Sequence, residues 1–506
     1  MKTPTATVAD NKIIPVNSEA DANKSLENEL FSEWVKAQKK NRLFSLLRAC
    51  KHYKILKNAN VFDERFYCAI YPDVKEYGAN NPLKSILKFT TSPLFHFVRH
   101  GVYDGRCPTK YFDVKYYVAN NQDIKNSRVN PFVHYIQYGK NEGRFPCGEK
   151  RVLIATGVKL EPVADTFEDK MKGVGGNTGN MVFANALMNQ LDVKKRDFHH
   201  ISKFQDEVND VACVIPSANF IIRGGPGLER VCYDFVKNNN FSTTLAGLGA
   251  QSDPRCDTPK KLVEAILPEK IKFFQAAAEQ TVSLGIRGEF TAECLELMGI
   301  KNYRIIGCPS FYQHPNGVFP KLKKPTADKT VMTVTTTNEH ETKLVEFGYK
   351  NNSDWVIQMP TELPYIETGE IEYTPFQKGH HFPGLVFDDA LFEYMRNHRK
   401  MFFNINEWND YLTNGGFTFA FGSRFHGNMN ALNHGIPTLW ITHDSRTTEL
   451  AKTLHLPRIT YKEFESAKSM EQLIEYCNYE ETEKHYPALF ENYKQFLREN
   501  GLKSNL

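Results

Sequence analysis

The sequence lacks the patterns that define several large classes of protein. It contains ten cysteines, but no two of them form a CxxC pair or a closely spaced cluster, so we expect free thiols in a reducing, cytoplasmic compartment. No segment approaches the roughly 20 apolar residues of a membrane span. The polar amino terminus also has no apolar run of signal-peptide length, so we expect neither secretion nor a transmembrane anchor.

A large excess of charge of one sign is also missing. The 63 Lys and Arg residues nearly balance the 59 Asp and Glu residues, and a net charge of +4 argues against a dedicated nucleic-acid binder. The sequence has no H-E-x-x-H or G-x-S-x-G motif, no protein-kinase motif set, and no cluster with metal-ligand spacing. We therefore expect no metal and no bound cofactor, and any preference for anions must come from local groups of residues.

Residues 1–60 are predicted to form a polar tail and a basic amphipathic helix. The tail extends to about residue 28 and has no periodic apolar pattern, which predicts flexibility. Residues 35–57 contain eight Lys and Arg and no acid, with leucines such as Leu46 and Leu47 at roughly helical spacing. This helix either contacts an anionic membrane face or packs with its basic side in solvent, and the second interpretation is favoured.

Residues 61–148 contain two copies of one sequence unit. "FDERFYCAIYPDVKEYG" is echoed by "FDVKYYVANNQDIKNS", and "PLFHFVRHGVYDGRCP" by "PFVHYIQYGKNEGRFP". Each copy has aromatic residues at helical spacing and ends in Gly-x-x-x-Gly-Arg, which predicts a small α-helical repeat module. His96 and His134 lie among aromatic residues, and we interpret them as packed core histidines rather than ligands.

After residue 150 the sequence alternates short apolar runs, rich in β-branched residues, with segments of helical length. This alternation is typical of doubly wound α/β domains. Runs such as "RVLIATGV" and "STTLAGLGAQ" form one series over residues 150–320, and runs such as "KTVMTVTTT" and "IPTLWITH" form a second over residues 325–460. We predict two Rossmann-like α/β lobes, followed by carboxyl-terminal helices over residues 461–506 that pack back on the lobes.

Titratable side chains follow three of the predicted strands, where ligands bind in open α/β sheets. Arginine there, beside the amino terminus of a helix, favours an anionic ligand. The alternative is structural: Arg424 pairs with Asp444 or Glu449 and ties two neighbouring loops together. The candidate residues of these loops are Arg287, Arg424, Phe425, His426, Gly427, Asp444, Arg446 and Glu449.

A glycine-rich loop in the first lobe is a second candidate. "GVGGNTGNMVFANAL" opens a predicted helix, and its glycines allow a ligand to approach the backbone closely. The alternative is a flexible turn before a helix, since the loop is neither a G-x-G-x-x-G fingerprint nor a Walker loop. The candidate binding residues of this loop are Gly176, Asn177, Gly179 and Asn180.

Three stretches, in order, resemble the polysaccharide pyruvyl transferase family: "GGNTGNMVFANAL", "GIRGEFTAECLELMGIKNYRIIGCPSFY" and "GSRFHGNMNALNHGIPTLWITHDSRTTEL". The resemblance extends over roughly residues 150–455. It implies a GT-B-like fold and transfer of a pyruvyl group from phosphoenolpyruvate to a sugar, forming a cyclic ketal. It also implies that Arg287, Arg424 and His426 hold the donor, while Phe425 acts through its backbone. The repeats lie outside the match and resemble modules beside bacterial glycosyltransferase domains.

The residue chemistry fits this activity. Phosphoenolpyruvate carries a phosphate and a carboxylate, which Arg287 and Arg424 can hold. We expect His426 to transfer a proton, with Asp444 or Glu449 orienting it or accepting a proton from a sugar hydroxyl. The expected partners are phosphoenolpyruvate and a sugar or lipid-linked glycan, with a peripheral contact at the inner membrane face as a further option. Two alternatives stay open: a glycosyltransferase with a nucleotide-sugar donor, and an inactive glycan-binding scaffold.

Overall fold

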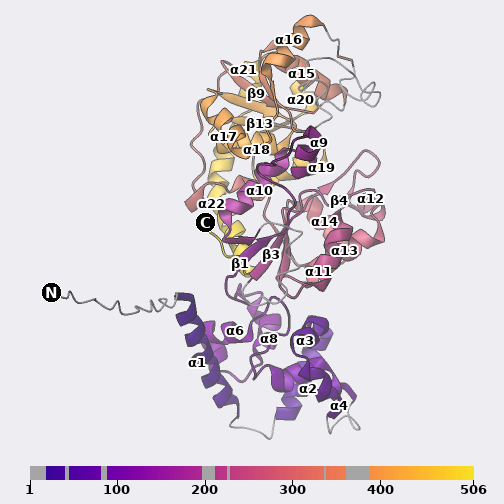
Figure 1. The fold of residues 1–506 in the computed structure, drawn as a ribbon, viewed down its shortest axis with the longest axis vertical. Helices are drawn as coiled ribbons and strands as arrows, with labels where there is room; N and C mark the ends of the chain where they lie inside the picture. Colours follow the sequence, from indigo (N-terminus) through magenta and orange to yellow (C-terminus); the bar gives the residue numbers. More distant parts are fainter. Residues whose placement is uncertain are drawn as a thin grey trace, which may run out of the picture. The chain divides into compact units, whose positions relative to one another are not determined.

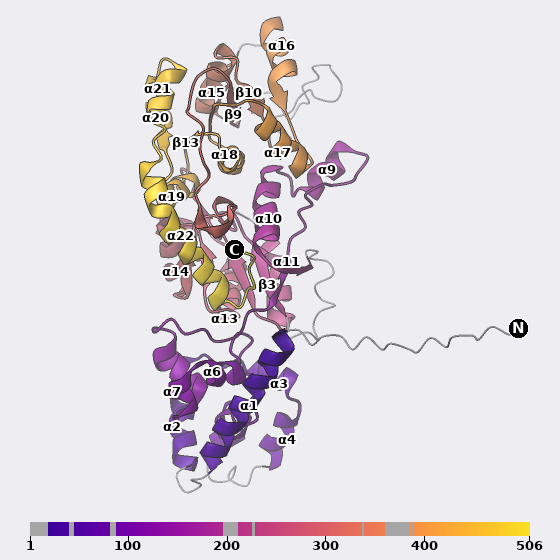
Figure 2. The ribbon, with the colours of Figure 1, turned by 90° about the vertical axis from the view of Figure 1, so that its left-hand side faces the viewer.

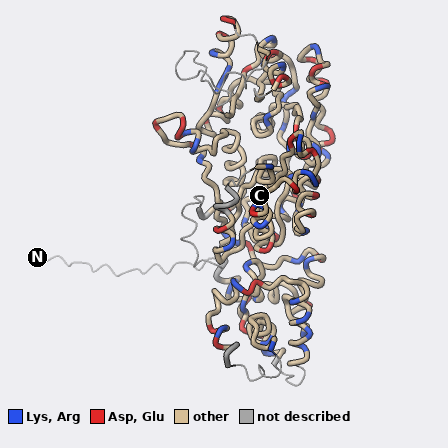
Figure 3. The backbone as a smooth tube through the Cα atoms, turned by 90° about the vertical axis from the view of Figure 1, so that its right-hand side faces the viewer, with Lys and Arg blue, Asp and Glu red and all other residues tan. Residues whose placement is uncertain are grey.

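The chain divides into two units, Met1–Gly148 and Glu149–Leu506 (Figure 1). Basic and acidic residues are interspersed along both units, as expected from the small net charge (Figure 3). In the part of the chain that is described, no helix is both long enough and apolar enough to span a membrane. The computed structural model describes residues 19–39, 45–80, 88–195, 211–224, 228–335, 338–359, 384–385 and 388–506.

The first helix of the amino-terminal unit corrects one expectation. α1 (Glu19–Lys39) includes the last ten residues of the predicted flexible tail, while residues 1–18 lie outside the described residues. Trp34 explains the order of this helix, because its side chain is buried in the core of the unit and stacks on Tyr103 with ring centroids 5.6 Å apart. Burial of an aromatic ring offsets the entropy lost by ordering a polar segment.

The predicted basic helix over residues 35–57 is divided between two helices. α1 ends at Lys39 and α2 spans Ser45–Ala59, with residues 40–44 outside the described residues. Ala49, His52 and Leu56 face the core from α2, whereas Leu47, expected on the apolar side, is 71% exposed. The buried side therefore follows a spacing of three and four residues that begins at Ala49 rather than at the leucines.

Short helices complete this unit, and α5 and α8 each begin with proline and continue into a π-helical turn. Proline suits the first helical position because that position needs no N–H donor. The short helices are α3 (Glu64–Ile70), α4 (Asp73–Asn80), η1 (Lys88–Thr91), α5 (Pro93–His96), η2 (Phe97–Gly101), α6 (Val114–Asn120), α7 (Gln122–Lys125), α8 (Pro131–His134) and η3 (Tyr135–Gly139).

Two tyrosine–histidine pairs connect these helices. The Tyr67 hydroxyl lies 2.9 Å from Nδ1 of His96, and the Tyr117 hydroxyl lies 3.0 Å from Nδ1 of His134. Burial, with the charge of Arg106 adding to it, lowers the pKa of His96 to about 4, so this imidazole is neutral at neutral pH. Both histidines are therefore packed and hydrogen-bonded, as the sequence predicted.

The second unit contains two parallel sheets, so the predicted mixed α/β class is confirmed. One sheet has the strand order β2-β1-β3-β5 and the other β11-β10-β9-β12-β13-β14. Two further parallel pairs, β4-β6 and β7-β8, lie outside these sheets. The strands are β1 (Arg151–Ile154), β2 (Val193–Lys195), β3 (Val211–Pro216), β4 (Ile221–Ile222), β5 (Thr243–Ala246), β6 (Ala250–Gln251), β7 (Leu284–Ile286), β8 (Tyr303–Ile305), β9 (Thr330–Thr333), β10 (Asp354–Val356), β11 (Arg399–Lys400), β12 (Phe419–Gly422), β13 (Thr438–Thr442) and β14 (Arg458–Thr460).

Helices connect the strands and cover the sheets, as parallel connections require (Figures 1 and 2). Helix α10 packs against α18, which joins the elements around the first sheet to those around the second. The helices are α9 (Phe167–Gly173), α10 (Gly179–Gln190), α11 (Leu228–Asn238), α12 (Pro259–Glu264), α13 (Pro268–Glu279), α14 (Glu289–Leu297), η5 (Pro309–Phe311), η6 (Pro315–Gly317), α15 (Glu339–Lys350), α16 (Asp389–His398), α17 (Ile405–Asn414), α18 (Phe425–Asn433), α19 (Ser445–Thr453), α20 (Tyr461–Ser466), α21 (Met470–Glu475) and α22 (Glu480–Glu499).

The last helix, α22, returns from the second group of elements to the first (Figure 2). Near its end Arg304 and Glu499 form an ion pair at 2.6 Å. Beyond it, the backbone N–H of Lys150 donates to the carbonyl of Gly501 at 2.8 Å, and the N–H of Lys503 donates to the carbonyl of Lys150 at 2.9 Å. The end of the chain therefore pairs with the segment that leads into β1.

Candidate active site

Three arginine- or aspartate-bearing loops follow parallel strands, as the sequence predicted. Arg287 follows β7, Arg424 follows β12 after one serine, and Asp444 follows β13 after one histidine. β12 and β13 are neighbours in the six-stranded sheet, with Phe421 opposite Leu439. Because parallel neighbours end at the same edge, the loops after β12 and β13 leave the sheet side by side.

The start of α19 is docked on β6, which brings the loop after β13 to the first group of strands. The Ser445 hydroxyl donates to the carbonyl of Ala250 at 3.0 Å and accepts from the N–H of Ser252 at 2.9 Å. One serine therefore takes part in two hydrogen bonds across this contact. Arg446, on the same helix, lies close enough to Arg287 for its positive charge to act on Arg287.

Arg287 is a buried cation with a spare donor. Its side chain is 1% exposed, and its Nε donates to the carbonyl of Gly247 at 2.9 Å. Its Nη2 has no hydrogen-bond partner among the described residues. Burial, and then the charge of Arg446, lowers its pKa to about 10, so the guanidinium stays charged at neutral pH. A buried charged donor of this kind calls for an anionic partner.

Arg424 is the residue immediately before α18, and its backbone N–H donates to the carbonyl of Thr333 at 3.0 Å. Burial is the main cause that lowers its pKa to about 10, and the charge of Glu341 opposes this effect. Glu341 accepts from the Thr335 N–H at 2.8 Å and from the Ser423 hydroxyl at 2.9 Å. The hydrogen-bonded carboxylate of Glu341 therefore lies near Arg424, and its negative charge helps to keep Arg424 charged.

Asp444 and Arg446 have local roles at the start of α19. Asp444 is the N-cap: its Oδ1 accepts from the backbone N–H of Thr447 at 2.7 Å and from the Thr447 hydroxyl at 2.8 Å. Nη2 of Arg446 lies 3.6 Å from Oδ2 of Asp444. Burial opposes ionisation of Asp444, but Arg446, His443 and Thr447 outweigh it and lower the pKa. This carboxylate is therefore charged and offsets part of the positive charge nearby.

His426 lies in the first turn of α18, among the arginines. Its Nε2 is 3.6 Å from Sγ of Cys308, and its ring stacks on Phe183 with centroids 5.8 Å apart and planes 11° apart. Burial, followed by the charges of Arg287 and Arg446, lowers its pKa well below 6.5. The imidazole is therefore neutral at neutral pH while no anion offsets these charges.

Glu449 connects α19 to α14. Its carboxylate accepts from the N–H of Thr291 at 3.0 Å and from the Thr291 hydroxyl at 2.6 Å. Burial raises its pKa from 4.5 to about 7, against the opposing effects of Thr291 and Arg287. Both carboxylate oxygens have partners, so the side chain ties two helices together beside Arg287.

The glycine loop lies against β10 and α18. Gly175 and Gly176 both have positive φ, at 67° and 76°, which explains why glycine is needed at these turns. The Asn177 side chain accepts from the N–H of Gly179 at 2.8 Å, and Asn180 donates to the carbonyls of Val174 and Gly175 at 3.1 and 3.3 Å. The asparagines therefore hold the loop in shape.

Two glycines make room for one glutamine where this loop meets α18. A Cβ atom added to Gly179 or to Gly427 would overlap the side-chain amide of Gln358, which follows β10. The glycine loop is thus packed directly against Gln358 and the first turn of α18. Gly427 therefore has a packing role in the same turn that carries His426.

A family model described as polysaccharide pyruvyl transferase matches residues 177–445, which is more than half of the chain and includes Arg287, Arg424 and His426. The chain belongs to the polysaccharide pyruvyl transferase family. The comparison with curated proteins finds no match. Gly176, Arg446 and Glu449 lie just outside the matched residues, so their roles rest on geometry alone.

Sequence reasoning missed several residues of this candidate site in the pyruvyl transferase. Glu341 reaches Ser423 and the hydroxyl of Tyr461, which are 82 and 120 residues away in the sequence. Cys308 contacts His426 and lies 3.0 Å from the Ser310 hydroxyl. Glu341 lies in the first turn of the helix that follows the strand of residues 330–333, and this position was the signal available for it in the sequence. Cys308 was visible only as a residue of the second family stretch.

One group of residues outside this site resembles a metal site. His455, Glu481 and His485 place potential ligand atoms within 4.8 Å of one another, although the sequence predicted no metal. The two imidazole rings are stacked, with centroids 3.9 Å apart and planes 10° apart. Lys484 also lies 3.1 Å from the carboxylate of Glu481. Parallel rings cannot both direct their nitrogen lone pairs at one ion, so binding would require side-chain rotation.

Proposed function

We propose that this pyruvyl transferase moves a pyruvyl group from phosphoenolpyruvate to two hydroxyls of one sugar in a polysaccharide or its precursor. The product is a cyclic ketal. The observation that supports this best is a group of neighbouring guanidiniums: Arg446 lies close enough to act on both Arg287 and Arg424, and the charges of Arg287 and Arg446 act on a neutral His426. Neighbouring cations, of which Arg287 is fully buried, are unfavourable unless an anion joins them, and phosphoenolpyruvate brings both a phosphate and a carboxylate.

The donor is held by charge-assisted hydrogen bonds. Nη2 of Arg287 and Nε of Arg446 are buried and have no hydrogen-bond partner among the described residues. Arginine forks match phosphate and carboxylate oxygens, and the amino terminus of α18 adds partial positive charge from its backbone N–H groups. In this proposal the negative charge of the donor replaces the missing partners of the arginines.

Donor binding prepares His426 to act as an acid. Arg287 and Arg446 help to keep this imidazole neutral, and a bound anion offsets their charges. The pKa of His426 then rises, so the ring takes up a proton and can give it to the methylene carbon of the donor. The enzyme therefore acquires its acid only when the donor is present.

The remaining steps use two sugar hydroxyls. Protonation of the methylene carbon leaves an oxocarbenium-like carbon, which the first hydroxyl attacks as it loses its proton. The C–O bond to phosphate then breaks, and inorganic phosphate leaves with the bonding electron pair. The second hydroxyl attacks the same carbon and loses its proton, which closes the ketal ring. One proton enters at carbon, two leave from the hydroxyls, and phosphate carries one away.

The acceptor side is assigned to the loop around Gly176 and Asn177 and to Asp444. A Cβ atom at Gly176 would meet nothing within 4 Å, so this part of the loop is open. Oδ2 of Asp444 has no hydrogen-bond partner among the described residues and can accept one from a sugar hydroxyl. In this proposal Glu449 is a positioning residue, because its carboxylate holds Thr291.

Binding of phosphoenolpyruvate to the purified full-length protein tests the proposal. Calorimetric titrations compare phosphoenolpyruvate with a nucleotide sugar, in the wild type and in Arg424→Ala, Arg424→Lys and Arg458→Ala. We expect phosphoenolpyruvate to bind at least tenfold more weakly to Arg424→Ala, since a hydrogen bond to a charged group contributes about 1.5–3 kcal/mol. The exposed Arg458 on β14 is the matched control and should leave binding unchanged.

The alternative outcomes are distinct. Binding of the nucleotide sugar alone, with loss in Arg424→Ala, would replace the proposal by a glycosyltransferase activity. Weaker binding in Arg424→Lys than in the wild type, with the same melting temperature, would show that the paired N–H donors of the guanidinium matter more than its charge. Equal loss of binding in Arg458→Ala would show that the effect is not specific to the site.

A further inference from the structure

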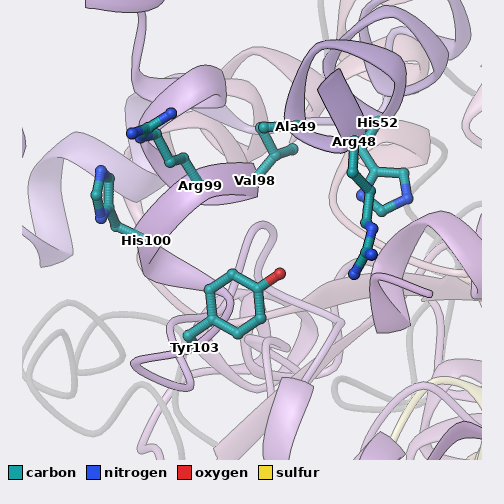
Figure 4. A pocket seen from close by; sticks show the side chains of 7 residues that line it. All are labelled: Arg48, Ala49, His52, Val98, Arg99, His100 and Tyr103. Atoms are coloured by element: carbon teal, nitrogen blue, oxygen red, sulfur yellow. The ribbon is translucent and has the colours of Figure 1, made fainter. Parts of the chain in front are cut away.

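The amino-terminal unit contains a small cavity where α2 meets η2. Its volume is about 150 Å³, and it lies among the side chains shown in Figure 4. This is below the about 300–1,000 Å³ of sites that hold drug-sized ligands, so the cavity fits a single small group. It is lined by Arg48, Ala49, His52, Val98, Arg99, His100 and Tyr103.

The lining contains basic groups on both sides and no carboxylate among the described residues. Figure 4 shows Arg48 and His52 on one side and Arg99 and His100 on the other. Nη1 of Arg99 is buried and has no hydrogen-bond partner among the described residues. Two guanidiniums without a carboxylate in the lining leave a positive potential inside a partly closed space.

The other polar groups of the cavity are neutral donors. Burial, followed by the charges of Arg48 and Lys51, lowers the pKa of His52 to about 4, so this ring is neutral at neutral pH. Burial raises the pKa of Tyr103, whose hydroxyl therefore stays protonated. Stacking on Trp34 at 5.6 Å fixes the Tyr103 ring. The cavity thus offers N–H and O–H groups around its positive charges.

We propose that this cavity binds a phosphate group, which is carried by a sugar or by a lipid or is free in solution. Arg48, Arg99 and Tyr103 line the cavity, with Arg48 and Arg99 on opposite sides in Figure 4, and a phosphate has enough oxygens to accept from several donors. A carboxylate carries one negative charge, whereas a phosphate carries up to two and offsets more of the positive charge of the two guanidiniums. The site is separate from the arginine group of the second unit and does not depend on its function.

Calorimetric titration of the full-length protein with inorganic phosphate tests this proposal. We expect the Arg48→Gln/Arg99→Gln double variant to bind one phosphate fewer per chain than the wild type, or to bind it at least tenfold more weakly. Lys57→Gln is the matched control, because Lys57 is an exposed cation on α2 that does not line the cavity. Single Arg48→Lys and Arg99→Lys variants keep the charge and should show intermediate affinities if the double variant does not fold.

Two further ligands distinguish the source of the phosphate, and glucuronate tests the preference for phosphate over a carboxylate. A hexose 1-phosphate that binds more tightly than inorganic phosphate, and depends on Arg48 and Arg99, supports a sugar phosphate. Vesicles with 30% phosphatidylglycerol that bind the wild type and Lys57→Gln, but not the double variant, support a lipid phosphate. Three results would overturn the proposal: equal binding of glucuronate, unchanged phosphate binding in the double variant, or equal loss in Lys57→Gln.

Discussion

Replacement of Glu449 by glutamine should change how the stability of the enzyme depends on pH. The unfolded chain ionises this carboxyl near 4.5, whereas burial in the folded protein raises its pKa to about 7. Between these values the folded form keeps a proton that the unfolded form has lost. The free energy of unfolding of the wild type therefore falls as pH rises from about 4.5 through 7.

The magnitude follows from the displacement of the pKa. One pKa unit corresponds to about 1.4 kcal/mol, so this group alone removes about 3 kcal/mol of stability between pH 4.5 and pH 8. Glu449→Gln has no such titration. Relative to the variant, the wild type should therefore lose about 3 kcal/mol over this range, whatever constant difference arises from the changed hydrogen bonds to Thr291.

Guanidinium denaturation of both proteins at pH 5, 6, 7 and 8 measures this difference. Glu475→Gln, at an exposed position at the end of α21, is the control and should follow the wild type at every pH. Parallel profiles for the wild type and Glu449→Gln would refute the reasoning, because they would mean that the folded environment does not disfavour the charged carboxylate.

Three other predictions concern separate parts of the molecule. Binding of phosphoenolpyruvate should be accompanied by proton uptake, because a bound anion raises the lowered pKa of His426. Calorimetry in buffers of different ionisation enthalpy measures this uptake. His426→Gln should abolish the uptake, and a binding heat that is the same in every buffer would contradict the prediction. Gly101→Ala should lower the melting temperature, with a cost of about 1–3 kcal/mol, because the added methyl group overlaps the hydroxyl of Tyr67. The amino-terminal unit should lose about 3 kcal/mol of stability from His96 alone as pH falls from 6.5 towards 4. The reason is that the unfolded chain takes up a proton on this histidine, whereas the folded chain does not. A circular-dichroism titration of His96→Gln should lack this loss.

Most strands of the second unit were predictable because they are buried runs of β-branched and aromatic residues. β3 and β13 are examples, with nearly every residue buried. β2, β11 and β14 were not predicted. Each of these strands lies at an edge of its sheet and has only two or three residues. Edge strands are short and often charged, as Arg399–Lys400 of β11 is, so they leave little periodic signal.

The site was predictable to the extent that strand ends determine it. Because Arg287, Arg424 and Asp444 directly follow apolar runs, their place at strand ends could be inferred from the sequence. The partners of Asp444 and Glu449 could not be inferred, since an N-cap and a bond to Thr291 depend on helix positions. For the same reason, the sequence could not show that Glu341 supports Arg424.

The pairing of Lys150 with Gly501 and Lys503 has a consequence for the topology of the catalytic unit. Its two ends meet on one side of the first sheet, so the unit is nearly a closed loop of chain. A short linker between Leu506 and residue 149 would join these ends without stretching any element. New termini could then be opened in a surface loop elsewhere in the unit, while the strand order of both parallel sheets is kept.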